Sequence, residues 1–119
     1  MQPKLLLACD ELMTRTRIEG AIALLGWAVT RIAGPETLAR WEEILEHRVV
    51  LLDLKFRAMS AEQVIDTVRR THCLNTIIIG FGPHSDERIP DLKRRGMDRF
   101  YPNSKIVPAL PEILAPLAE

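Results

Sequence analysis

The stretch Val49-Val50-Leu51-Leu52-Asp53-Leu54 decides the fold class of this chain. Its apolar residues form a nearly continuous run, which is typical of a β-strand covered on both faces. Asp53 stands near the carboxyl end of that run, where parallel α/β sheets build their binding sites. Because an unpaired buried carboxylate is costly, we expect Asp53 to face a crevice and to meet water, a cation or a hydrogen-bond donor there.

Strand-like segments alternate with segments of helical length along the whole chain. The predicted strands cover residues 4–9, 28–33, 49–54, 76–81 and, more weakly, 98–101. Strict βα alternation favours parallel strands joined by right-handed crossovers, which place helices on both faces of the sheet. The sequence therefore predicts an α/β fold with a five-stranded parallel sheet in the flavodoxin-like order 2-1-3-4-5 and five helices.

Two of the helices have clear boundaries in the sequence. The first is predicted over residues 12–25, with Gly26 where a helix stop is expected. Ser60 and Gln63 form a capping-box pattern at the start of the third, which ends near Arg69-Arg70. Such basic runs, including Lys93-Arg94-Arg95, are interpreted as solvated charges that stabilise helix ends.

Prolines set the predicted limits of the other three helices. Pro35 opens the second helix, whose apolar stripe includes Trp41. Pro90 falls within the first turn of the fourth helix or shortens it. Pro108 and Pro111 crowd the last segment, so the fifth helix is predicted to start at Pro108 and to end early.

Composition limits the functions that this chain can have. Its 119 residues fit a single domain over 1–119, and its 16 basic and 16 acidic residues cancel. A neutral chain has no long-range attraction to nucleic acid or to an anionic membrane, so neither is predicted as a partner. The apolar run Leu5 to Cys9 is too short for a signal-peptide core or a membrane span, which indicates a cytoplasmic protein. Cys9 and Cys73 lack CxxC spacing and are interpreted as buried, reduced thiols.

Four segments resemble the receiver domain of two-component response regulators, the CheY-like fold. They are Lys4 to Glu11, the Gly26-Trp27 turn, Leu51 to Leu54 and Gly96 to Phe100. Their order and spacing cover nearly the whole chain. The resemblance implies a three-layer sandwich, and it implies that Asp53 stands where receivers accept a phosphoryl group.

The resemblance also implies a magnesium site beside Asp53. Receivers use an acidic pair after the first strand to help hold Mg²⁺, and here Cys9 takes the first place and Asp10 the second. The candidate metal-site residues are therefore Asp10, Asp53 and Lys55, with a backbone carbonyl after Asp53 as a further oxygen. A group that carries several negative charges needs such a cation to offset the repulsion.

Two more positions depart from the receiver pattern. Where receivers end the fourth strand with a hydroxyl residue, an ungapped alignment places Phe81, and a one-residue slip places Gly80. Where receivers carry a lysine after the fifth strand, counting from Gly96 selects Asn103, although Lys105 lies two residues further on. We prefer Asn103, and we keep Lys105 as a candidate catalytic residue. Loss of the hydroxyl and of the lysine would remove the groups that sense a phosphoryl group in receivers.

These observations lead to two hypotheses of function. The first is a stand-alone, receiver-like signalling module that is not an enzyme and binds a protein, either a sensor kinase or a downstream effector. The contact surface would be the fourth helix, the fifth strand with Phe100 and Tyr101, and the fifth helix; a homodimer is compatible with this. The second is an active phosphoreceiver that takes a phosphoryl group on Asp53 with Mg²⁺, helped by Asp10 and Lys105.

Simpler interpretations stand beside both hypotheses. Asp10 and Asp53 would then be polar residues that pair with Lys55, Arg57 or Lys105 at the crevice. A third functional class is a small hydrolase or transferase. The sequence shows no nucleophile paired with a general base for it, because His84 and Cys9 are candidates only by position. No phosphate-binding glycine motif follows any strand.

Overall fold

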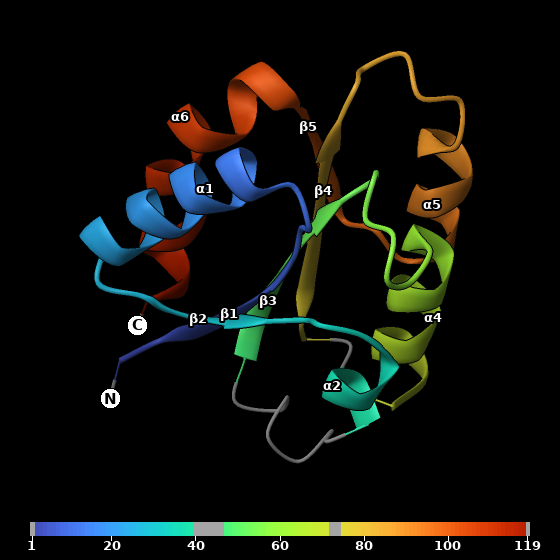
Figure 1. Ribbon diagram of the computed structural model, residues 1–119, viewed down its shortest axis with the longest axis horizontal. Coiled ribbons are helices and arrows are strands. Elements are labelled where there is room, and N and C mark those ends of the chain that lie inside the picture. Colours follow the sequence, from blue (N-terminus) through green and yellow to red (C-terminus); the bar gives the residue numbers. More distant parts are fainter. Residues whose placement is uncertain (1, 40–46, 72–74, 119) are drawn as a thin grey trace.

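Five parallel strands form one sheet, with helices on both of its faces (Figure 1). The computed structural model describes residues 2–39, 47–71 and 75–118. The sheet order is β2-β1-β3-β4-β5, as the sequence predicts. The strands are β1 (Lys4–Ala8), β2 (Ala28–Arg31), β3 (His47–Asp53), β4 (Ile77–Gly82) and β5 (Arg99–Pro102).

The helices form the two outer layers of a three-layer sandwich. They are α1 (Leu12–Leu24), α2 (Pro35–Ala39), α4 (Ala61–Thr71), α5 (Ile89–Arg95), α6 (Asn103–Leu114) and the 3-10 turn η1 (Ala115–Leu117). Figure 1 shows α1 and α6 on one side of the sheet and α2, α4 and α5 on the other. The predicted flavodoxin-like fold is thereby confirmed. Trp41, Leu45 and Cys73 lie outside the described residues.

Alternate residues of each strand enter two separate cores. Leu5 and Leu7 pack toward α1 and α6, whereas Leu6 and Ala8 pack toward α4 and α5. Because successive side chains of a strand point to opposite faces, this alternation also fixes which way the strand ends point. The same parity places Cys9, Asp53 and Phe81 together on the side of α1 and α6, at the carboxyl edge of the sheet.

The sequence features predicted at the start of α4, after α1 and in the first turn of α5 are present in the structure. The Ser60 backbone N–H donates to Gln63 Oε1 over 2.9 Å, and the Gln63 N–H donates to Ser60 Oγ over 3.0 Å, so the capping box of α4 is confirmed. Gly26 adopts a φ of 82° just after α1, a conformation that favours glycine. Pro90 occupies the first turn of α5.

The predicted start of the last helix is wrong. α6 begins at Asn103, five residues before Pro108, and both Pro108 and Pro111 lie inside it. The apolar face of the helix explains this, because Ile106, Leu110, Ile113 and Leu114 are all buried in the core that α1 shares. Pro108 removes only the hydrogen bond to the carbonyl of Ser104, and that residue is exposed, so water can replace the donor.

Replacing Pro108 with alanine is expected to raise the free energy of unfolding by about 1 kcal/mol, because alanine supplies the missing N–H and relieves the clash with the preceding turn. Urea unfolding followed by far-UV circular dichroism measures the change. Pro116→Ala is the matched control: Pro116 lies in the first turn of η1, where proline is tolerated, so its replacement should change little. Equal gains in both variants would contradict this account of α6.

None of the helices within residues 2–39, 47–71 and 75–118 combines the length and the apolar character needed to cross a membrane.

Candidate functional site

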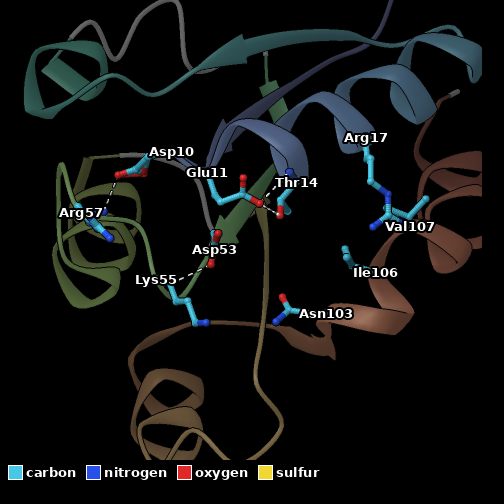
Figure 2. Close-up of a pocket in the computed structure, with 10 residues that line it drawn as sticks. All are labelled: Asp10, Glu11, Thr14, Arg17, Asp53, Lys55, Arg57, Asn103, Ile106 and Val107. Carbon is cyan, nitrogen blue, oxygen red and sulfur yellow. Dashed lines mark hydrogen bonds between the residues drawn. The ribbon is translucent and has the colours of Figure 1, made fainter.

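A cavity of about 610 Å³ opens at the carboxyl edge of the sheet, between α1, the segment after β3 and the start of α6. Its lining combines three carboxylates, three cationic side chains, two other polar side chains and two apolar ones. Figure 2 shows these residues: Asp10, Glu11, Thr14, Arg17, Asp53, Lys55, Arg57, Asn103, Ile106 and Val107. The crevice expected beside Asp53 is therefore present.

Asp53 is the last residue of β3 and is only 7% exposed. Both of its carboxylate oxygens have hydrogen-bond donors. The backbone N–H of Lys55 donates to Oδ1 over 2.9 Å, and the Cys9 thiol donates to Oδ2 over 3.5 Å. Within the described part of the chain, no lysine or arginine side chain forms an ion pair with Asp53, so neutral donors alone stabilise its buried charge.

Cys9 is a neutral hydrogen-bond donor at this site. Burial, the charge of Asp53 and the hydrogen bond to Asp53 together raise the pKa of its thiol from 9.0 to about 12. A thiolate would face the Asp53 carboxylate without a cation, so the thiol keeps its proton. The thiol therefore donates a hydrogen bond to Asp53 and adds no negative charge to the cavity.

The raised pKa of Cys9 predicts a pH dependence of stability. The folded protein holds this proton more tightly than the unfolded chain, so the stabilisation is fully present below pH 9.0 and is lost as the pH rises toward about 12. The urea midpoint should therefore fall as the pH is raised from 9.0 toward about 12, and it should fall less in Cys9→Ser, which does not titrate there. An equal fall in both proteins would show that Cys9 is not the cause.

Asp10 and Glu11 line the cavity but are already engaged. Asp10 Oδ2 accepts the backbone N–H of Arg57 over 2.8 Å. Glu11 is the N-cap of α1: its oxygens accept the N–H groups of Met13 and Thr14 over 2.7 and 3.1 Å. The Thr14 hydroxyl donates to it as well and is the main reason that the pKa of Glu11 is lowered. Sequence analysis missed Glu11 because glutamate is not among the preferred N-cap residues.

These carboxylates fit a magnesium ion only in part. Asp10 and Asp53 offer the oxygen ligands that Mg²⁺ prefers, and Mg²⁺ commonly binds one or two carboxylates together with water. Cys9 offers a protonated sulfur, which is a poor ligand for a hard cation. In the described residues, no three His, Cys, Asp or Glu side chains are grouped so that they could hold a metal ion. As long as Glu11 caps α1, a cation here would rely on two protein carboxylates, those of Asp10 and Asp53.

The basic side chains that line the cavity come from α1 and from the segment after β3. Asn103 lines the cavity at the first residue of α6, whereas Lys105 is exposed and is not part of the lining. Of these two residues, the structure thus places Asn103, and not Lys105, in the cavity lining that includes Asp53. In Figure 2 the side chain of Lys55, an exposed residue of the segment after β3, runs toward Asn103.

Phe81 fills the place opposite Asp53 on the neighbouring strand. The two residues are register partners between β3 and β4, and Phe81 is completely buried. Gly80, the alternative at this position, lies against the side chain of Met97, and an added Cβ would overlap the Met97 sulfur. Among these residues, none carries a hydroxyl group. The residue of β4 that pairs with Asp53 is therefore a buried aromatic side chain in the α1 and α6 core.

Arg88 joins the β4–α5 loop to the segment that follows Asp53. Its guanidinium donates to the Leu54 carbonyl over 2.8 Å and binds both oxygens of Asp86. It also lies 3.8 Å from Glu62 of α4. The hydrogen bonds from Arg88 lower the pKa of Asp86. These contacts connect the loop to the segment after β3 and to α4. His84 of the same loop is exposed and does not line the cavity.

No protein-family model matches the chain, and no curated protein matches it in sequence. Solved structures with the same fold are numerous. A receiver domain of a sensor histidine kinase from Pseudomonas aeruginosa, with a magnesium ion coordinated in its active-site cleft, superposes with a TM-score of 0.78 at 20% identity; the match covers 96% of this chain and 95% of that one.

Two other receiver domains give similar values. The receiver domain of a response regulator from Bermanella marisrubri has a TM-score of 0.75 at 15% identity, over 96% of this chain and 99% of that one. The receiver domain of TorR, the response regulator of the TMAO respiratory system, has a TM-score of 0.76 at 17% identity, over 94% and 96%. At these identities the similarity establishes the receiver fold, as the sequence resemblance predicts.

Proposed function

We propose that this chain, which shares the receiver fold, is a signalling module that works by binding a protein partner and does not turn over a substrate. The observation that supports this most directly is the state of Asp53. Both of its oxygens accept hydrogen bonds from neutral donors, and one of these donors, Cys9, replaces a carboxylate of the receiver pattern. Asp53 therefore has a hydrogen-bond donor on each carboxylate oxygen without a metal ion.

The partner would bind the surface that α5, β5 and α6 form, in the cytoplasm. This is the surface that the receiver resemblance points to, and Phe100 and Tyr101 are half-buried there. The partner class is either a sensor kinase or a downstream effector. The contacts of Arg88 also favour a module that does not depend on phosphorylation. They join the loop before α5 to the segment after Asp53 in the absence of a phosphoryl group.

The proposal is tested by incubating the purified protein with acetyl phosphate and Mg²⁺ and measuring its intact mass. We expect no stoichiometric gain of a phosphoryl group. An unrelated, active receiver treated in parallel shows that the reagent works. Stoichiometric labelling of this protein that disappears in Asp53→Asn would contradict the proposal.

The same experiment decides for or against the second candidate, an active phosphoreceiver. One observation favours that candidate: Asp10 and Asp53 both line the open cavity, where a cation and a small phosphodonor can enter. Asp10, Asp53 and the carbonyl of Lys55 would hold Mg²⁺, which supplies positive charge to the oxygens of the donor. Asn103 cannot supply the cation of the receiver lysine, so we expect Lys55→Ala to abolish labelling if labelling occurs.

A further inference from the structure

Positive charge is concentrated in one part of an otherwise neutral chain. Residues 88–105 carry six basic and two acidic side chains, although the whole chain has 16 of each. This segment contains α5, β5 and the first turn of α6, which are neighbours in Figure 1. β5 is an edge strand of the sheet because it pairs only with β4. The charge therefore gathers along one edge of the sheet.

The contacts of α5 show which of its charges border this edge. Arg95 binds Asp66 of α4 over 2.9 Å and also pairs with Asp91, so both residues lie on the side of α5 that faces α4. Lys93 is about 160° from each of them around the helix. It therefore lies on the opposite side, next to Ile89, which packs with Phe100 of β5 against the same core.

The contacts of α6 place Lys105 in the same way. Asn103 and Val107 line the cavity together with Arg17 of α1, so they lie on the α1 side of α6. Lys105 is about 160° from both around the helix and is exposed on the side away from α1. Arg99 is exposed on β5 itself, between the two helices. We call Lys93, Arg99 and Lys105 the basic edge.

None of the three forms an ion pair in the part of the chain that the structure describes, whereas Arg69, Arg88 and Arg95 all do. The basic edge is thus a set of uncompensated charges. Phe100 and Tyr101 lie between these charges and are only half-buried. A complementary surface would offer carboxylates around a few apolar side chains, because charges at the rim and apolar groups at the centre are the usual arrangement of protein interfaces.

From this arrangement we infer that the basic edge binds an acidic segment of a partner protein that also carries apolar residues. This rests on the proposed function, since it names the chemistry of the partner that the α5, β5 and α6 surface takes. The edge also has free backbone groups on β5, but the strand has only four residues and ends at Pro102, which has no N–H. Side-chain contacts therefore carry the recognition, and strand addition contributes little.

The test uses the whole protein and a short fluorescein-labelled peptide of alternating glutamate and leucine, with fluorescence anisotropy as the measurement. We expect binding that weakens as salt is added. Lys93→Glu, Arg99→Glu and Lys105→Glu should each weaken it about threefold or more, and the triple variant about tenfold or more. Arg70→Glu, at an exposed basic residue near the end of α4, is the matched control and should leave the affinity unchanged.

Three outcomes would overturn the inference. The first is an affinity that the three substitutions do not change, or that Arg70→Glu lowers equally. The second is tighter binding of a single-stranded DNA of the same charge, which would assign the edge to phosphate polymers. The third is a dimer that the same substitutions dissociate, which would assign the edge to a second copy of this chain.

Peptide binding and phosphoryl labelling separate this inference from the proposed function. If the unchanged protein neither binds the peptide nor becomes labelled at Asp53, the inference is overturned and the proposed function is not. Labelling of Asp53 with unchanged peptide binding would overturn the proposed function alone.

Discussion

Replacing Cys9 with aspartate is expected to raise the affinity for Mg²⁺ by about tenfold or more, because a third carboxylate would join Asp10 and Asp53 and cation affinity follows the charge of the ligand set. The Cys9 sulfur now lies 3.5 Å from Asp53 Oδ2. A carboxylate there would face Asp53 across a similar gap. Isothermal titration calorimetry at neutral pH measures the change.

The same substitution should make stability depend on the metal. Without Mg²⁺, two buried carboxylates repel each other, so Cys9→Asp should unfold at a lower temperature than the unchanged protein. Mg²⁺ should restore the loss, since a ligand that binds only the folded state stabilises it. Cys9→Asn is the control, because it has nearly the same shape without the charge. If both variants bind Mg²⁺ equally, the missing carboxylate is not what limits the site.

Replacing Phe81 with threonine, which restores a hydroxyl at the receiver position, is expected to lower the free energy of unfolding by about 3 kcal/mol. The ring is completely buried, and its removal leaves a cavity at the centre of the α1 and α6 core. Urea unfolding followed by Trp27 fluorescence measures the loss. Phe81→Leu keeps most of the apolar volume and should cost about 1 kcal/mol.

A loss in Phe81→Thr no larger than that in Phe81→Leu would show that the core can collapse around the gap. If the larger loss is found, the stability of the α1 and α6 core depends on the aromatic ring of Phe81. The hydroxyl of the receiver pattern could then return only together with changes in the residues that pack around it. Recovery of phosphoryl chemistry by single substitutions at this position is therefore not expected.

The strand run around Asp53 was enough to predict the sheet, because a doubly covered strand and strict βα alternation leave few topologies. The position of Asp53 at the carboxyl edge followed from the same run. The start of α6 could not be predicted, because local proline preferences oppose a helix there while the burial of Ile106 and Leu110 favours it. Burial depends on the whole fold, and no local pattern shows it.

The hydrogen-bond partners of the site residues could not be predicted from the sequence either. The sequence placed Asp10 and Asp53 near Lys55 and Arg57, and the structure does so. The contacts, however, come from the backbone N–H groups of these two residues and not from their charges. The preference for Asn103 over Lys105 depended only on counting from Gly96, and Asn103 is the one that lines the cavity. Counting worked because no residue is inserted between β5 and α6.

Glu11 both lines the cavity and caps the N-terminus of α1. Its carboxylate holds the first free N–H groups of α1, at Met13 and Thr14, and it also borders the space beside Asp53. A cation that draws this carboxylate away must release those two amides to solvent, so occupancy and fraying of the helix are thermodynamically linked. Faster hydrogen exchange at Met13 and Thr14 would therefore signal a filled site, even where the ion itself leaves no spectroscopic trace.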